Sequence, residues 1–233
     1  MKYRTGYYWQ TEEVPHTALV LQHLVYRKRK KPLFWGCICT EGDCEEQKSR
    51  RSAYYVKQLT EWFHKKGRRW CLGEKAGDFD RLRVTLAEAI ADMDAEVAAH
   101  DRFLGEKGRN EVELAGLVCG EERFLLFYRG NLRAYLLNRR LSKGHCMRLQ
   151  GERLGTVHVL SGIMQPGIGL LLITGKMAEK CGEDRLQECL NISELLQAHS
   201  LQRYLEELGG EAVKQGGRYM GALLLLTDEW KEE

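Results

Sequence analysis

The chain has 233 residues, of which 43% are hydrophobic and 30% charged, and its formal net charge is +3. A chain of this size and composition can bury a core large enough to fold without disulfides or a structural metal, and so small a charge does not by itself indicate a nucleic-acid partner. The longest apolar run, near "GIGLLLITG", is shorter than the roughly 20 residues of a membrane helix, and the N-terminus has no signal-peptide pattern. We therefore expect one cytoplasmic domain over residues 1–233, with no membrane partner and with its eight cysteines reduced.

The first predicted elements are two strands joined by a basic loop, in the stretch "TALVLQHLVYRKRKKPLFWGCIC" that begins at Thr17. Apolar residues run almost unbroken through both strands, so we expect both to be well buried in a sheet. The loop belongs to a basic region, because residues 27–69 contain 13 Lys or Arg and 5 Asp or Glu. Such a run is typical of a solvated loop, and an acidic or phosphate-rich partner, nucleic acid included, is the less favoured alternative.

Two helices are predicted next, over residues 47–66 and 79–104. Apolar residues recur at helical spacing in both, as in the series Leu82, Leu86 and Ile90 of the second helix. Basic residues and a glycine at "HKKG" end the first helix, as the helix dipole and the C-cap preference favour.

Beyond the second helix the pattern changes to short strands. "EVELAGLVCG", "ERFLLFYRG" and "LRAYLLNRR" are separated by short turns and predict a three-stranded antiparallel meander. "TVHVLSG", "GIGLLLITG" and "GALLLLTDEW" predict three further strands. "EDRLQECL" and "SELLQAHSLQRYLEELGG" predict helices, the second one capped by Ser193. This order of elements favours an α+β fold with helices packed on antiparallel sheet.

Two stretches carry a resemblance to a known family. In "ERFLLFYRGNLRAYLLNRR" the residues that fit the motif N-x-G-D-S-R-x-Y-L are Gly130, Arg133, Ala134, Tyr135 and Leu136, and Asn131 stands where aspartate is usual. In "RLGTVHVLSGIMQPGIGLLLITG" the residues that fit a Leu-Gly, Pro-Gly-Asp and Thr-Asp-Gly series are Leu154, Gly155, Pro166, Gly167 and Thr174. Over residues 6–226 the sequence thus resembles the metal-dependent serine/threonine protein phosphatases of type 2C.

The resemblance implies a four-layer αββα sandwich, in which two antiparallel sheets are flanked by helix pairs. It also implies a catalytic centre of two Mn²⁺ or Mg²⁺ ions held by aspartates, which activates a bridging water. In this sequence the positions that the resemblance assigns to that centre are occupied by Thr40, Glu41, Gly175, Lys176, Tyr219 and Met220. The N-terminal aspartate of the family is likewise replaced, by Pro15 or His16.

The joint loss of these aspartates removes about four negative charges, without which two adjacent dications have no counter-charge. We therefore expect no catalytic residues, no metal site and no cofactor, and a pseudophosphatase that binds a phosphoprotein, a kinase or a signalling domain. The alternative is an active phosphatase with a rearranged metal site that uses Glu41, Asp43 or Glu45.

Three cysteines near Thr40 and Glu41 allow a second kind of metal site. Cys37, Cys39 and Cys44 are possible zinc ligands, but their spacing is uncommon, and the first two fall on one face of a predicted strand. Core packing is the favoured interpretation. The adjacent His145 and Cys146 are only a weak candidate for a nucleophilic pair, because such a pair must face each other in space.

Overall fold

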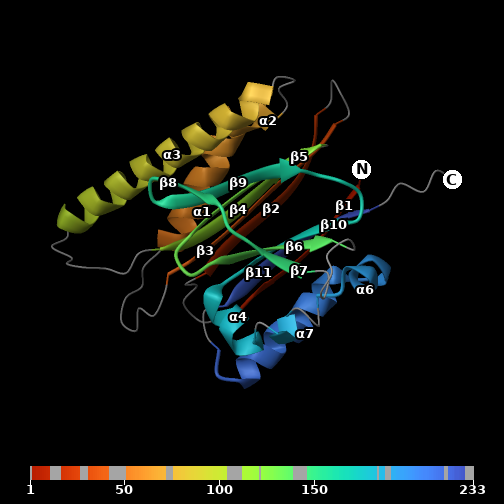
Figure 1. The fold of residues 1–233 in the computed structure, drawn as a ribbon. Helices are drawn as coiled ribbons and strands as arrows, with labels where there is room; N and C mark the ends of the chain where they lie inside the picture. The colour runs from red at the N-terminus through yellow and green to blue at the C-terminus, as the bar shows by residue number, and fades with distance from the viewer. Residues whose placement is uncertain are drawn as a thin grey trace.

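The structure, a computed structural model, describes residues 2–10, 17–26, 31–41, 51–71, 76–103, 112–120, 122–138, 146–182, 184–186, 190–217 and 220–228. Its strands form two antiparallel sheets that face each other (Figure 1). Sheet A contains, in spatial order, β1 (Lys2–Trp9), β11 (Gly221–Asp228), β10 (Ile168–Ile173), β6 (Arg133–Asn138) and β7 (Cys146–Leu149). Sheet B contains β2 (Thr17–Tyr26), β3 (Lys31–Thr40), β4 (Glu113–Cys119), β5 (Arg123–Arg129), β9 (Val157–Ile163) and β8 (Glu152–Leu154).

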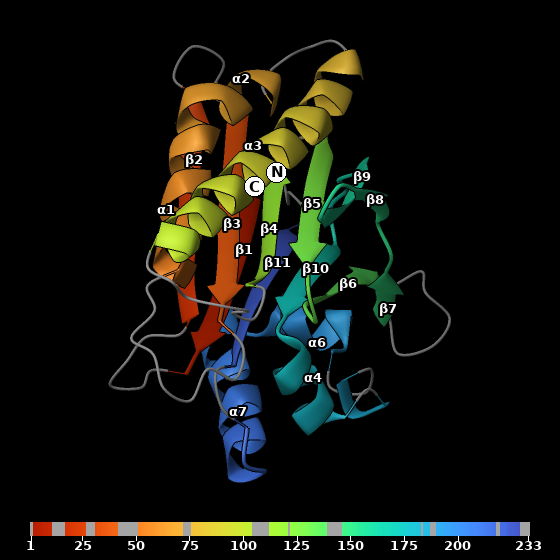
Figure 2. The same cartoon turned by 90° about the vertical axis from the view of Figure 1, so that its left-hand side faces the viewer.

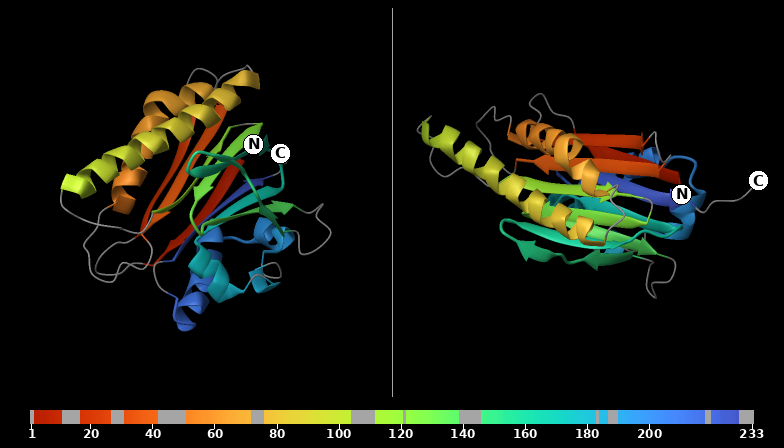
Figure 3. Two further views of the ribbon diagram at one scale, coloured as in Figure 1. Left: turned by 60° about the vertical axis from the view of Figure 1, so that its left-hand side comes forward. Right: turned by 90° about the horizontal axis from the view of Figure 1, so that it is seen from above.

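Helices cover the outer face of each sheet, as Figures 1 and 2 show. Over sheet B lie α1 (Arg51–Trp62), the π-helical turn η1 (Phe63–Gly67), α2 (Arg68–Cys71) and α3 (Ala76–Phe103). Against sheet A lie α4 (Gly175–Cys181), α6 (Ile192–Gln197) and α7 (Leu201–Lys214). The order of layers is therefore helix, sheet, sheet, helix (Figure 3), and the predicted α+β sandwich is confirmed. Among the described residues, no helix is both long enough and apolar enough to cross a membrane.

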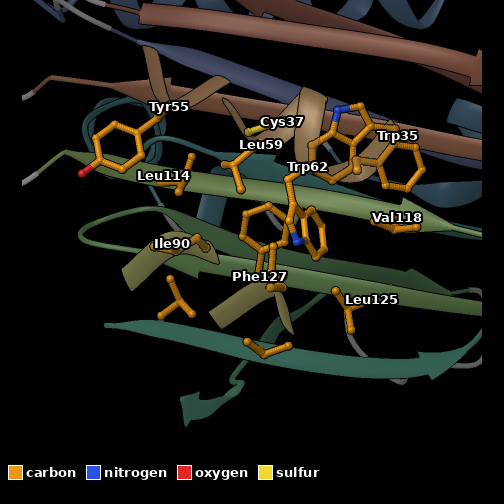
Figure 4. Packing of buried hydrophobic residues seen from close by; sticks show 14 of the residues in the cluster. Trp35, Cys37, Tyr55, Leu59, Trp62, Ile90, Leu114, Val118, Leu125 and Phe127 are labelled. Atoms are coloured by element: carbon orange, nitrogen blue, oxygen red, sulfur yellow. The ribbon is translucent and has the colours of Figure 1, made fainter. Parts of the chain in front are cut away.

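Buried apolar side chains form three clusters, one between the two sheets and one between each sheet and its helices. In the cluster under α1 and α3, the Trp35 ring stacks on Phe63 with centroids 4.7 Å apart and on Phe127 at 6.1 Å. Figure 4 shows Trp35 and Phe127 of this group together with Trp62. The central strands β4 and β10 are buried on both faces, which explains their continuous apolar sequences.

The predicted three-stranded meander is wrong, because its strands belong to different sheets. β4 pairs with β5, but β6 pairs with β10 and β7 in sheet A. The chain crosses between sheets at the turn of Gly130 and Asn131, where Gly130 has φ +76°. β9 occupies the place beside β5 that a meander would give to β6. Short turns and alternating residues indicate strands, but they do not determine the sheet in which each strand pairs.

The predicted helix bounds also need correction. The segment expected as one helix capped by Ser193 forms both α6 and α7. Asn191 caps α6 by accepting the amide N–H of Ser193 at 3.0 Å, and Ser200 caps α7 by accepting that of Arg203 at 3.2 Å. α3 begins at Ala76, three residues before the expected start. Of the predicted helix "EDRLQECL", residues 184–186 and 190 are described, and residues 184–186 are helical.

Two neighbouring glycines in α7 give a matched test of the packing against sheet A. A Cβ at Gly209 would lie less than 3.0 Å from the Tyr8 ring of β1, whereas a Cβ at Gly210 would meet nothing within 4 Å. We expect Gly209→Ala to lower the free energy of unfolding by about 2 kcal/mol through overpacking. Gly210→Ala is expected to raise it by roughly 0.5–1 kcal/mol, because alanine favours the helix. Urea denaturation of both variants checks this, and equal effects at the two positions would contradict the packing described.

Candidate functional site

The positions that the resemblance assigns to the metal centre lie at one end of the sandwich. β3 finishes there at Thr40, which pairs with Glu113 at the start of β4. β10 finishes at Ile173, which pairs with Ala222 near the start of β11. The β5–β6 turn joins the two sheets at this end (Figure 2), which we call the candidate-site end.

The structure thus brings five of the six assigned residues to the candidate-site end: Thr40, Glu41, Gly175, Lys176 and Met220. The sixth, Tyr219, lies outside the described residues. The other sequence candidates that lie outside them are Pro15, His16, Asp43, Cys44, Glu45 and His145.

Glu41 is buried and holds the start of α1. Its side chain is 4% exposed, and its Oε1 accepts the amide N–H of Ser52 at 2.7 Å. A carboxylate at this position accepts a hydrogen bond from an N–H group that has no partner within the helix. Its negative charge also lies at the positive end of the helix dipole. Its Oε2 is buried and has no hydrogen-bond partner among the described residues. Thr40, the preceding residue, is 2% exposed at the end of β3 and supplies no carboxylate.

Gly175 is packed too closely to carry any side chain. A Cβ at this position would lie less than 3.0 Å from both the Cγ and the backbone oxygen of Asn131 in the β5–β6 turn. The turn and α4 are also linked by polar contacts, since Asn131 Nδ2 donates to Glu179 Oε1 at 3.1 Å and Arg133 Nη2 to the same oxygen at 3.2 Å. The backbone of the turn therefore occupies the space that an aspartate at position 175 would need.

Met220 is fully buried and belongs to the apolar cluster between sheet A and its helices. The backbone beside it is held by Thr174, whose Oγ1 accepts the amide N–H of Gly221 at 3.1 Å. A thioether sulfur is a soft donor, whereas Mn²⁺ and Mg²⁺ take oxygen ligands. Met220 therefore acts as a core residue at a place where the family has a polar one.

These residues do not fit a two-cation centre. The described positions offer a threonine, a glycine without space for a side chain, a lysine, a buried methionine and one carboxylate that is already hydrogen-bonded to α1. Within the described part of the chain, no group of three or more His, Cys, Asp or Glu side chains is placed to hold a metal ion. A pair of divalent cations needs several carboxylate oxygens, which this set does not supply.

A buried ion pair lies close to this end and was not predicted from the sequence. Arg129, at the end of β5, donates from Nη1 to both carboxylate oxygens of Asp94 in α3, each at 2.7 Å. Tyr55 of α1 donates its hydroxyl to Asp94 at 2.6 Å, and Thr156 donates to the same carboxylate at 3.1 Å. Burial, followed by the hydrogen bond to Asp94, raises the pKa of Tyr55. The network ties both helices to sheet B, and each of its four side chains is engaged within it.

The cysteine candidates have the properties of core residues. Cys37 and Cys39 are fully buried in β3 and pack in the same cluster, so the prediction that they share one face is confirmed. Burial raises the pKa of both thiols, which disfavours the thiolate that zinc binds. The six cysteines in the described residues are free thiols: Cys37, Cys39, Cys71, Cys119, Cys146 and Cys181.

The fold is that of the bacterial serine/threonine phosphatases. PppA, described as a key regulatory component of T6SS in Pseudomonas aeruginosa, is 13% identical with a TM-score of 0.67, over 97% of this chain and 98% of that chain. The serine/threonine phosphatase Stp1 from Staphylococcus aureus is 12% identical with a TM-score of 0.70, over 99% and 96%. The Mycobacterium tuberculosis serine/threonine phosphatase PstP/Ppp is 12% identical with a TM-score of 0.67, over 97% and 99%. No protein-family model matches the sequence, and no curated protein matches it.

Proposed function

We propose that residues 1–233 form one catalytically inactive, phosphatase-like domain that works in the cytoplasm as a protein-binding module in signalling. The observation that carries the proposal is the packing at Gly175, where the backbone oxygen of Asn131 leaves no space for the aspartate that the resemblance places there. Thr40 and Met220 add to it, because neither provides a carboxylate at its position. The expected partner is a phosphoprotein, a kinase or another signalling domain.

The residues that keep the family pattern support the same interpretation. Gly130 and Gly167 both have positive φ and stand in turns that connect strands. Tyr135 is fully buried in the core under α4 and α7. These residues maintain the fold, whereas the replaced ones would have performed the chemistry. A binding module that evolved on an enzyme scaffold would keep the first group and lose the second, because function depends on the site residues and not on the fold.

One observation favours the alternative, an active phosphatase with a rearranged metal site. Glu41 Oε2 is buried without a hydrogen-bond partner among the described residues, so it is available to a cation. The other oxygen of the same carboxylate is bound to the Ser52 amide N–H. A cation at Glu41 would therefore need most of its ligands from water or from residues such as Asp43 and Glu45.

Calorimetric titration with Mn²⁺ separates the two proposals. We expect no saturable binding to the wild-type protein, because the described donors do not fit a metal pair. An active type 2C phosphatase in the same buffer is the positive control. Glu41→Gln and Asp43→Asn are the diagnostic variants, since they remove a charge and keep the shape of the side chain. Saturable Mn²⁺ binding to the wild-type protein that is lost in either variant would establish a rearranged site and overturn the proposal.

A further inference from the structure

β2 has the sequence of a central strand but lies at the margin of sheet B. Its apolar residues predict a strand that is well buried, and this prediction is wrong for β2, although it is confirmed for β3. β2 pairs with β3 on one side only, and no described strand follows it on the other (Figure 2). The described side chains of residues 18–22 are therefore half-buried instead of buried.

The outer side of β2 has the features of an edge that can take another strand. Its ten residues pair with β3 in one continuous register from Thr17 with Thr40 to Tyr26 with Lys31, without a bulge. The strand contains no Asp, Glu, Lys, Arg or Pro. Within the described residues, the backbone of β2 makes no hydrogen bond beyond this ladder. Proteins usually protect so long an edge with charges, proline or a bulge, and β2 has none of these.

Both faces of β2 carry apolar side chains that a further strand would cover. On the helix side, Ala18, Val20 and Leu24 pack against the cluster under α1 and α3. On the opposite side, Leu19 and Leu21 pack against the cluster between the sheets. All five are only partly buried.

The neighbouring edge strand, β1, is protected in a way that β2 is not. The two edges are close, since Thr5 Oγ1 of β1 lies 3.1 Å from His23 Nε2 of β2. α7 packs along β1, and the side chain of Gln202 accepts the amide N–H of Tyr7 at 3.0 Å. β1 also carries the charged residue Arg4, whose guanidinium donates to backbone oxygens around Leu196 and Ala198. Of these two neighbouring edges, the one that the described residues leave open is therefore that of β2.

We propose that the β2 edge binds a second copy of this chain, with the two β2 strands antiparallel about a two-fold axis. Paired residues of antiparallel strands point to the same face, so a register that places Leu21 opposite itself gives one apolar pair on each face, Leu21 with Leu21 and Ala18 with Leu24. The pairs across the axis are Leu21 with Leu21, Val20 with Gln22, Leu19 with His23 and Ala18 with Leu24. A strand without charged residues is self-complementary, since no like charges meet, and a two-fold interface uses the same patch on both subunits. Sheet B then continues from one subunit into the other.

Light scattering coupled to size-exclusion chromatography across a dilution series tests this dimer. We expect the wild-type chain to elute with twice the mass of one chain and to dissociate on dilution. Val20→Lys with His23→Lys places cations on both faces of the edge, where long side chains reach water without unfolding the strand. The double variant should weaken self-association about tenfold or more. Val84→Lys is the matched control, because Val84 is an exposed apolar residue of α3 away from this edge, and it should remain a dimer.

A cross-link provides a second measurement if the charged variant does not fold. Leu21→Cys places one thiol on each side of the proposed axis, within reach of a disulfide. Mild oxidation should convert this variant, but not the wild-type chain, into a covalent dimer. A wild-type protein that is monomeric at every concentration would overturn the proposal. So would a dimer that persists unchanged in the folded lysine variant, or a Leu21→Cys dimer that does not cross-link.

Discussion

Replacing Gly175 with aspartate is expected to lower the free energy of unfolding by about 3 kcal/mol and to create no Mn²⁺ affinity. The added Cβ would lie less than 3.0 Å from the backbone oxygen of Asn131, so a change of side-chain rotamer cannot relieve the clash. Either the β5–β6 turn or the start of α4 has to move. Urea denaturation and Mn²⁺ titration of the same preparation measure the two effects.

Gly175→Ala is the matched control, because it adds the Cβ without the charge. Because the clash comes from the Cβ, we expect Gly175→Ala to lower the free energy of unfolding by most of the amount that Gly175→Asp does. A Gly175→Asp protein as stable as the wild type, or one that gains Mn²⁺ binding, would show that the turn yields easily. In that case position 175 would still be suited to a metal ligand, and its packing would no longer indicate an inactive protein.

Asp94→Ala is expected to lower the free energy of unfolding by about 3 kcal/mol, because it leaves the buried guanidinium of Arg129 without a counter-charge. Arg129 is 6% exposed at the end of β5, and both of its short contacts at Nη1 go to this carboxylate. Glu207→Ala, which breaks the exposed pair of Arg203 and Glu207 in α7, is expected to cost less than about 0.5 kcal/mol. Chemical denaturation of both variants compares a buried ion pair with an exposed one.

The double variant Asp94→Leu with Arg129→Met completes this comparison. Removing both charges leaves no unpaired ion. The loss of unfolding free energy in the double variant should therefore be smaller than the sum of the losses for Asp94→Leu alone and Arg129→Met alone. Additive effects, or an Asp94→Ala cost no larger than that of Glu207→Ala, would contradict the role assigned to the network. Loss of the network would also remove the polar contacts that join α1 and α3 to sheet B, and would leave the apolar cluster between them in place.

The strands could be predicted from the sequence because central strands such as β10 are continuously apolar. An apolar run of this kind is a local property of the sequence. The pairing could not, since residues that follow one another at the β5–β6 turn enter different sheets. β2 is a second case in which the local sequence does not determine the position of a strand in its sheet. Its sequence indicates burial, but burial depends on whether a neighbouring strand is present, and no local pattern contains that information.

The candidate site follows a similar division. The resemblance assigned Thr40 and Gly175 to one metal centre, and the strand registers bring both residues to the same end of the sandwich. The crowding at Gly175 depends on Asn131, 44 positions earlier (175 − 131), whose backbone approaches only in three dimensions. The pair of Asp94 and Arg129 spans 35 positions, and a single arginine in a buried strand gives no indication of its partner. Contacts of this range need the folded structure.

Hydrolysis of p-nitrophenyl phosphate in excess Mn²⁺ tests the central claim most directly. An active type 2C phosphatase in the same buffer provides the reference rate. For this protein we predict no turnover above the buffer rate, with the wild-type and Glu41→Gln chains indistinguishable. Turnover that depends on Mn²⁺ and falls in Glu41→Gln would contradict the account and identify the protein as a phosphatase with a relocated metal site.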